Sequence, residues 1–92
     1  MSIFNNIVSN YLETKANSLL KKGKAEEAIA YYDIVLKIQK DFYEAYLGKG
    51  IALACLHKYD EAEECYDRVI ELSPKDPWIY SNKAIVLLRK KM

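Results

Sequence analysis

Apolar side chains recur at spacings of three and four residues along most of this chain, which is the period of one face of an α-helix. Over residues 2–22 this stripe consists of Ile3, Phe4, Ile7, Val8, Tyr11, Leu12, Ala16, Leu19 and Leu20. Similar stripes predict further helices at about 25–39, 43–56, 59–72 and 77–91. No segment shows the alternation of a β-strand, so the pattern predicts an all-α chain of five helices.

The breaks between the stripes are short and have the chemistry of helix ends. Gly23 follows Lys21 and Lys22, which suits the end of the first helix, because glycine and basic side chains are favoured there. The strongest break is 73–77, where Pro77 can occupy the first turn of the last helix since its missing N–H is not needed there. Short connections predict that consecutive helices pack antiparallel.

The chain also repeats itself with a period of 34 residues. The matching pairs are Lys15/Lys49, Leu19/Leu53, Lys24/Lys58, Glu27/Glu61, Ala28/Ala62, Tyr32/Tyr66, Asp33/Asp67 and Val35/Val69. The series restarts with Tyr46/Tyr80, Lys49/Lys83, Ile51/Ile85 and Leu53/Leu87. A fixed period of this size is typical of stacked-repeat proteins, in which each unit packs on its neighbour and the stack presents an extended surface.

The repeat resembles the tetratricopeptide repeat (TPR) family, which has two helices in each 34-residue unit. Residues 43–76 match through Tyr46, Gly50, Leu53, Tyr59, Ala62, Tyr66, Val69 and Pro74. Residues 9–42 match more weakly, through Leu12, Ala16, Leu19, Gly23, Ala25, Ala28, Tyr32 and Val35, with Lys40 where the family usually has proline. Residues 77–92 match the first half only, through Tyr80, Ala84 and Leu87. The resemblance implies one domain over 1–92, a right-handed α-α superhelix of about two and a half helix hairpins, with 1–8 as an N-terminal helix extension.

Small residues at equivalent positions agree with this resemblance. The first helix of each unit has Ala16, Gly50 or Ala84 at one register, and the second helix has Ala28 or Ala62. Small side chains let two helix backbones approach closely, and large neighbours then fill the space beside them.

Composition and charge narrow the class of protein. The chain is 51% hydrophobic and 29% charged with a net charge of +1, so no concentrated positive charge favours nucleic acid or an anionic membrane. We expect no transmembrane helix and no signal peptide, because no long apolar run and no basic start are present. Cys55 and Cys65 then read as reduced thiols, which predicts a cytoplasmic protein.

No constellation of catalytic, cofactor-binding or metal-binding residues stands out. His57 is the single histidine, and we expect it to be an exposed turn residue. Cys55 and Cys65 lack CxxC spacing, and Cys65 is expected to be a small packing residue. Gly48 and Gly50 lie inside a helical pattern, so they form no phosphate loop. The sequence therefore predicts no enzyme, no cofactor and no metal.

The TPR resemblance implies that the first helix of each repeat lines a concave groove. Carried over position by position, that face comprises Asn10, Glu13, Asn17, Glu44, Leu47, Gly48, Ile51, Cys55, Trp78, Ser81, Asn82, Ile85 and Arg89. The predicted partner-binding residues are Glu13, Asn17, Glu44, Leu47, Gly48, Ile51, Trp78, Asn82 and Ile85. The family's clamp for chaperone C-terminal carboxylates would fall on Glu13 and Asn17, then Gly48, then Trp78 and Asn82, of which Asn17 alone fits. The predicted partner is therefore a protein or peptide with an apolar segment.

Two groove positions have alternative interpretations. A second glycine in one helix costs about 1 kcal/mol relative to alanine, so Gly48 either lets a partner approach the backbone or reflects tolerated drift. Trp78 is either an exposed interface anchor or a cover for the end of the preceding helix.

The two ends of the stack suggest a second function. Apolar side chains without a partner in the chain are expected at Ile3, Phe4, Ile7, Val8, Ile79, Val86 and Leu87. Unpaired apolar faces of this kind indicate self-association or further repeats. We therefore expect a non-enzymatic protein–protein interaction module or scaffold that binds a peptide or helix in its groove. The alternative is a homo-oligomerisation module that associates through its apolar end helices.

Overall fold

The computed structural model describes residues 2–92 and confirms the all-α prediction; Met1, the first residue of the predicted domain, lies outside the described residues. Its helices are α1 (Ile3–Lys21), α2 (Ala25–Ile38), α3 (Tyr43–Cys55), α4 (Tyr59–Leu72) and α5 (Pro77–Lys90). Every predicted helix end lies within one residue of the observed one.

Side-chain caps fix the starts of the first and last helices. The Asn5 backbone N–H donates to the Ser2 hydroxyl at 3.2 Å, and the Trp78 N–H donates to an Asp76 carboxylate oxygen at 3.0 Å. Each cap satisfies one of the backbone donors that a helix N-terminus leaves unpaired. Pro77 occupies the first turn of α5, as the sequence predicts.

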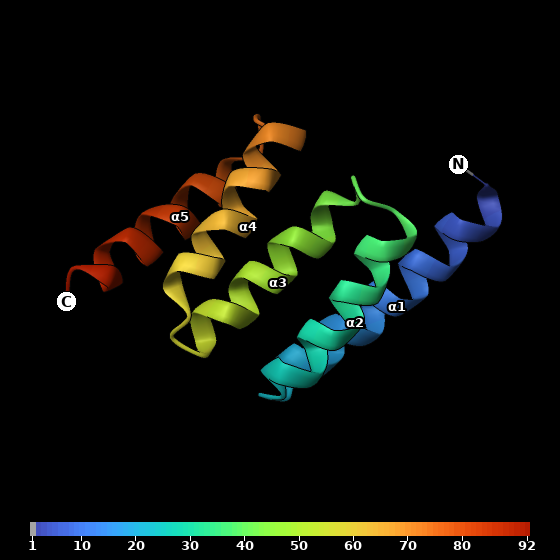
Figure 1. The fold of residues 1–92 in the computed structure, drawn as a ribbon, viewed down its shortest axis with the longest axis horizontal. Helices are drawn as coiled ribbons and strands as arrows, with labels where there is room; N and C mark the ends of the chain where they lie inside the picture. The colour runs from blue at the N-terminus through green and yellow to red at the C-terminus, as the bar shows by residue number, and fades with distance from the viewer. Residues whose placement is uncertain (1) are drawn as a thin grey trace.

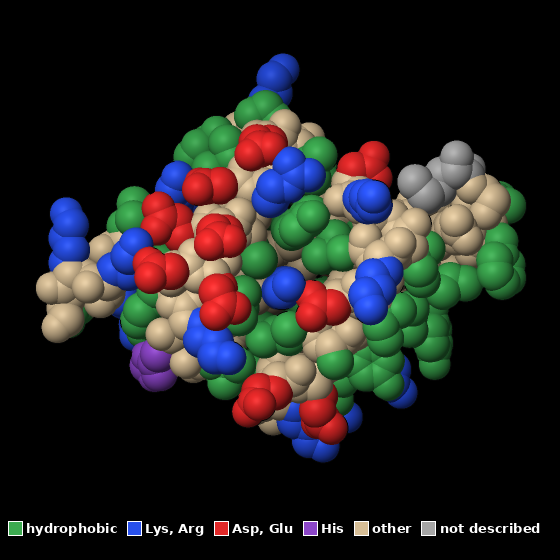
Figure 2. Space-filling model, viewed as in Figure 1, with side chains coloured by type: hydrophobic (Ala, Val, Ile, Leu, Met, Phe, Trp, Pro, Cys, Tyr) green, Lys and Arg blue, Asp and Glu red, His purple; other side chains and the backbone are tan. Residues whose placement is uncertain are grey.

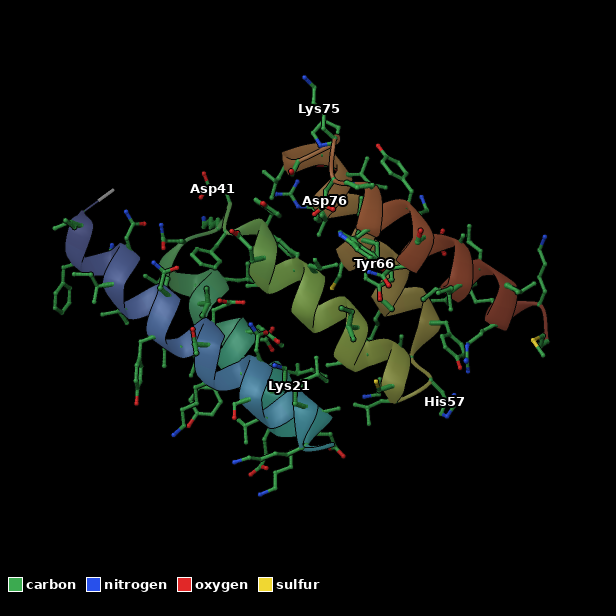
Figure 3. The ribbon with its side chains drawn as sticks, turned by 180° about the vertical axis from the view of Figure 1, so that it is seen from behind. Lys21, Asp41, His57, Tyr66, Lys75 and Asp76 are labelled. Carbon is green, nitrogen blue, oxygen red and sulfur yellow. The ribbon has the colours of Figure 1, made fainter. Side chains whose placement is uncertain are left out.

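The turns inside the two hairpins have the same left-handed backbone. Gly23 has a φ of 81° and His57 has a φ of 62°. Each turn closes with an equivalent hydrogen bond of 2.9 Å, from the Lys24 N–H to the Leu19 carbonyl and from the Lys58 N–H to the Leu53 carbonyl. His57 is exposed, as expected, and lies at one edge of the molecule together with Lys21 (Figure 3). The connections between repeats, marked by Asp41 and Asp76, lie at the opposite edge.

The helices stack in chain order along the longest axis of the molecule, which measures 43 × 28 × 18 Å (Figure 1). Each helix packs on the next one, and α3 also contacts both α1 and α5. Seen from behind, α1 and α5 lie in front of α2 and α4. The first helices of the repeats therefore share one side of the stack, and the second helices share the other.

Two apolar clusters hold the stack together, one for each helix hairpin. The first contains Ala16, Ala28, Tyr32, Val35 and Ala45. The second contains Leu53, Ala62, Cys65, Tyr66, Val69, Ile79 and Val86. Each cluster takes residues from the following repeat, Ala45 in the first and Ile79 and Val86 in the second. Cys65 is a packing residue here, as predicted.

Two residues assigned to a self-association face are therefore core residues. Ile79 is completely buried and Val86 is 1% exposed, so neither can meet another copy. The 34-residue register explains this, because Ile79 and Val86 correspond to Ala45 and Ala52, which are also completely buried. By contrast, Ile3, Phe4 and Ile7 are exposed, Leu87 is partly exposed and Val8 is half-buried.

Ion pairs recur between consecutive repeats in the same register. Lys49 of α3 lies 2.7 Å from Asp33 of α2, and Lys83 of α5 lies 2.6 Å from Asp67 of α4. Figure 2 shows the acidic side chains gathered in a row over α4, with basic side chains beside them. Each pair is partly exposed, so each contributes only about 0–1 kcal/mol. Their recurrence 34 residues apart shows that α3 on α2 and α5 on α4 pack in the same register.

Candidate functional site

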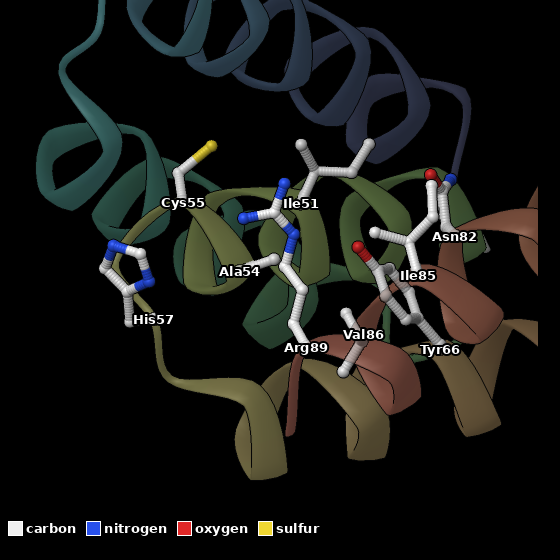
Figure 4. Close-up of a pocket in the computed structure, with 9 residues that line it drawn as sticks. All are labelled: Ile51, Ala54, Cys55, His57, Tyr66, Asn82, Ile85, Val86 and Arg89. Carbon is white, nitrogen blue, oxygen red and sulfur yellow. The ribbon is translucent and has the colours of Figure 1, made fainter. Parts of the chain in front are cut away.

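The predicted groove residues lie on α1, α3 and α5, whose shared side forms the candidate site. Helix α3 contacts both α1 and α5, so the three helices adjoin one another on this side. Its C-terminal part, between α3 and α5, is hollowed into a pocket of about 260 Å³. The pocket is lined by Ile51, Ala54, Cys55, His57, Tyr66, Asn82, Ile85, Val86 and Arg89 (Figure 4). The structure thus brings together three of the predicted partner-binding residues, Ile51, Asn82 and Ile85.

The pocket combines an apolar lining with polar groups at its margin. Ile51 and Ala54 of α3 face Ile85 of α5, and the Arg89 side chain extends from α5 toward α3 (Figure 4). Ligand pockets of this kind bind apolar side chains, while the few polar groups select orientation. A guanidinium at the margin can form a paired hydrogen bond with a carboxylate.

Tyr66 links this pocket to the core. Its ring is 2% exposed and lies against Gly50 of α3, where an added Cβ would lie less than 3.0 Å from the ring. Burial raises the pKa of Tyr66 to about 12, with smaller contributions from Cys65 and Cys55, so its hydroxyl remains protonated at neutral pH and can donate a hydrogen bond.

A hydrogen-bonded chain organises the N-terminal part of the surface. The Asn17 side-chain Nδ2 donates to a Glu13 carboxylate oxygen at 2.5 Å, and the Tyr32 hydroxyl donates to the side-chain Oδ1 of Asn17. Burial, and then the negative charge of Glu13, raises the pKa of Tyr32 to about 12. Hydrogen bonds therefore hold Asn17 between Glu13 and Tyr32. Glu13 is half-buried and Glu44 is exposed.

Gly48 has a structural role that neither interpretation of its sequence position described. It is buried, and an added Cβ would lie less than 3.0 Å from two ring carbons and the hydroxyl oxygen of Tyr32. The missing side chain makes room for a tyrosine of the preceding repeat, so the prediction that it lets a partner approach is wrong. The next repeat has Asn82 at this register, and Asn82 lines the pocket beside Tyr66.

The remaining predicted positions differ in exposure. Trp78 is 74% exposed, so it does not cover the end of α4 in the way the alternative interpretation required. Leu47 is half-buried and packs against the second cluster, which leaves only part of its side chain available.

Sequence reasoning missed Ala54, His57, Tyr66 and Val86 as pocket residues. The sequence predicts packing for Tyr66 and a self-association face for Val86, whereas the structure places both in the core and in the lining of the pocket. His57 enters because the left-handed turn brings its ring to the end of α3, where its Nδ1 lies 2.6 Å from the Tyr59 hydroxyl. The available signal was the equivalence of His57 with Gly23, which marks a turn but not the direction of a ring.

A second hollow of about 210 Å³ lies between α3 and α4. Tyr46, Lys49 and Cys65 contribute to its lining. Burial raises the pKa of the Cys65 thiol to about 11, partly opposed by Lys49, so the thiol is protonated and unreactive at neutral pH.

Within residues 2–92, histidine, cysteine and acidic side chains nowhere gather in threes as a metal ion would require. In the same part of the chain, none of the helices has both the length and the apolar character needed to cross a membrane.

Comparison with solved structures finds the same helical stack. MamA RS-1 ArsTM double mutant superposes with a TM-score of 0.83 at 29% identity, over 90% of this chain and 47% of that one. The TPR protein YrrB, described as having an unusual peptide-binding site, gives a TM-score of 0.80 at 21% identity, over 98% of this chain and 50% of that one. The first TPR of Spaghetti (RPAP3), bound to the HSP90 peptide SRMEEVD, gives 0.63 at 20% identity, over 92% and 94% of the two chains.

Sequence relatives agree with these structures. Tetratricopeptide repeat protein 12 of Mus musculus is 33% identical over 61 residues, and the uncharacterized protein MJ0572 of Methanocaldococcus jannaschii is 30% identical over 60 residues. The matches cover 66% and 65% of this chain, and 9% and 70% of those proteins. The chain thus spans less than a tenth of the mouse protein. The family model described as tetratricopeptide repeat matches residues 13–91, so this chain belongs to the tetratricopeptide repeat family.

Proposed function

We propose that this chain is a non-enzymatic protein-interaction module that binds an apolar peptide segment or helix across α1, α3 and α5. The observation that carries the proposal is the pocket between α3 and α5, in which Ile51 and Ile85 form an apolar lining. Spaghetti and YrrB are described as binding peptides, and their likeness in fold supports the same class of function for this chain.

The charges along the surface favour one orientation of the bound segment. Glu13 lies on α1 and Glu44 in the first turn of α3, whereas Arg89 lies at the pocket on α5. Opposite charges at the two ends of a site select a partner with the complementary arrangement. The proposed ligand therefore has an apolar side chain for the pocket, an acidic group near Arg89 and a basic flank toward α1.

Trp78 supplies an anchor beside the pocket. Its ring is 74% exposed and lies on the same helix as Asn82 and Ile85. Tryptophan is enriched among residues that dominate binding free energy, so an exposed ring at this position favours a protein partner.

Selection from a library of random peptides displayed on phage tests this function. The selected peptides should be rich in apolar residues, and Ile85→Glu should weaken their binding about tenfold or more, which is a free-energy change of about 1.4 kcal/mol. Ile34→Glu is the matched control, because Ile34 is an exposed isoleucine on α2, away from the pocket. Failure to select any peptide, or equal weakening by both variants, would contradict the proposal.

A further inference from the structure

The side chains of α5 divide into three stripes with different environments. The core stripe, Ile79, Lys83, Val86 and Lys90, faces α4 through two buried side chains and the ion pairs of Lys83 with Asp67 and of Lys90 with Asp60 and Glu63. The groove stripe consists of Trp78, Asn82, Ile85 and Arg89. The end stripe consists of Pro77, Tyr80, Ala84, Leu87, Leu88 and Lys91, all of which are exposed.

The end stripe is the face that binds another helix in the complete repeats. In α3 the equivalent residues are Tyr46, Gly50 and Leu53, and Leu53 is only 3% exposed because α4 covers it. On α5 the corresponding side chains Tyr80 and Leu87 are 49% and 37% exposed, and Leu88 is 64% exposed. This face therefore has the composition of a helix–helix contact but no helix on it among residues 2–92.

Small residues mark where the covering helix comes closest. Gly50 lies beneath the Tyr66 ring of α4, and Ala16 is completely buried in the first hairpin. Ala84 occupies the same register at the centre of the end stripe and is exposed. A small residue at the centre lets the backbone of another helix approach closely.

The ends of the stripe carry opposite charges. Asp76 precedes the first turn of α5 and uses one carboxylate oxygen to cap Trp78, which leaves the second oxygen for a cation. Lys91 is exposed at the other end. In an antiparallel pair of α5 helices centred on Ala84, helical arithmetic places Tyr80 opposite Leu88 and Lys91 opposite Pro77, beside Asp76. Both ends of such a pair are then complementary, and the two helix dipoles are opposed, which is favourable.

We propose that the end stripe of α5 binds the end stripe of a second copy of this chain, with the two α5 helices antiparallel about a two-fold axis at Ala84. This isologous contact uses the same residues in both copies and closes the assembly as a dimer. One helix from each copy buries less surface than the ~1,600 Å² of a standard interface, so the dimer should dissociate on dilution.

Sedimentation analysis of residues 1–92 over a range of concentrations tests the dimer. The unmodified chain should change from monomer to dimer as concentration rises, and Leu88→Glu should raise the dissociation constant about tenfold or more. Ile85→Glu is the matched control, since it adds the same charge to the groove stripe three residues away. It should leave the dimer unchanged. A strict monomer at all concentrations, or equal effects of the two variants, would overturn the proposal.

Disulfide cross-linking tests the antiparallel geometry, with Cys55→Ser in every variant to remove the exposed thiol. Ala84→Cys should cross-link to itself under mild oxidation. Leu88→Cys should cross-link to Tyr80→Cys in a mixture, but not to itself. The opposite pattern, with Leu88→Cys joining only to itself, would rule out this geometry. Peptide binding by Leu88→Glu should remain intact, so the dimer and the groove can fail independently.

Discussion

At the scale of single residues, the two glycines of α3 each receive a tyrosine ring, Tyr32 at Gly48 and Tyr66 at Gly50. Gly48→Ala should destabilise the fold, because overpacking a buried ring costs about 1–3 kcal/mol. That cost exceeds the gain of about 1 kcal/mol in helix propensity. Urea unfolding measures the difference. In a Tyr32→Leu background the same substitution should become neutral or stabilising. A rise of about 1 kcal/mol in the free energy of unfolding from Gly48→Ala alone would show that the Tyr32 ring does not fill the space beside Gly48.

The hairpin turns make a second residue-scale prediction, because both require a left-handed backbone. His57 has a φ of 62°, a conformation that costs a non-glycine residue about 1–2 kcal/mol. His57→Gly should therefore raise stability by about 0.5–1 kcal/mol, after the added flexibility of glycine in the unfolded chain is subtracted. Gly23→Ala, at the equivalent turn, should lower it by about 1 kcal/mol. Thermal melting measures the stability of both variants. Melting temperatures that change in the same direction in His57→Gly and Gly23→Ala would contradict the shared turn geometry.

Burial of tyrosine hydroxyls predicts the response to alkaline pH. The pKa of Tyr66 is raised by burial to about 12, whereas an unfolded tyrosine titrates near 10. The unfolded chain therefore loses this proton first. The contribution of the protonated Tyr66 hydroxyl to the free energy of unfolding is fully present below pH 10 and is lost as pH rises toward 12. Tyr66→Phe should lose less stability than the unmodified chain between pH 9 and about 12. Tyr11→Phe, whose ring is 65% exposed, is the control and should follow the unmodified chain.

At the scale of helices, local sequence signals and the 34-residue period together predict where helices end and which of their residues are buried. The helix ends were predictable because Gly23, Pro77 and the apolar stripes are local signals. The prediction for Ile79 and Val86 is wrong: the sequence puts both on an exposed end face because α5 is rich in apolar residues, whereas both are buried. Comparison with Ala45 and Ala52 would have placed them in the core. Gly48 could not be explained from its own helix, since the ring that fills its space belongs to the preceding repeat.

A matched pair of alanines tests how complete the packing of each helix is. Ala62 of α4 is completely buried, whereas Ala84 of α5 is exposed. Ala62→Leu should overpack the second hairpin and lower the free energy of unfolding by about 1–3 kcal/mol. Ala84→Leu adds the same volume to an open face and should change it by less than about 0.5 kcal/mol. Equal losses from the two, measured by urea unfolding at concentrations that keep the chain monomeric, would mean that the α5 face is already covered.

At the scale of the whole molecule, the candidate site is only partly readable from sequence. Ile51, Asn82 and Ile85 follow from the register, because the first helices of a stack share one side. Tyr66 and His57 enter the pocket through packing across a hairpin and through a turn, and these depend on how α3, α4 and α5 are arranged in space. The predicted repeat boundaries at 42/43 and 76/77 stay a prediction.

The stack also predicts how stability is distributed along the chain. Helix α3 contacts α1, α2, α4 and α5, whereas α5 contacts only α3 and α4. In a stack held by neighbour contacts, an end unit can open without its distant neighbours. We therefore expect the amide hydrogens of α3 to exchange slowest with solvent, and those of α5 and of the first turns of α1 to exchange fastest.

Ile79→Ala makes this expectation testable, because Ile79 is the completely buried anchor of α5 on α4. Removing it should cost about 2–5 kcal/mol locally. In a stack with neighbour coupling, hydrogen exchange should accelerate throughout α5 while α1 and α2 keep their protection. A single cooperative unit would instead lose protection equally in every helix, since all amides would then exchange through the same global unfolding. Exchange measured by mass spectrometry on dilute protein separates the two outcomes, and a uniform loss would show that the two and a half hairpins behave as one cooperative unit.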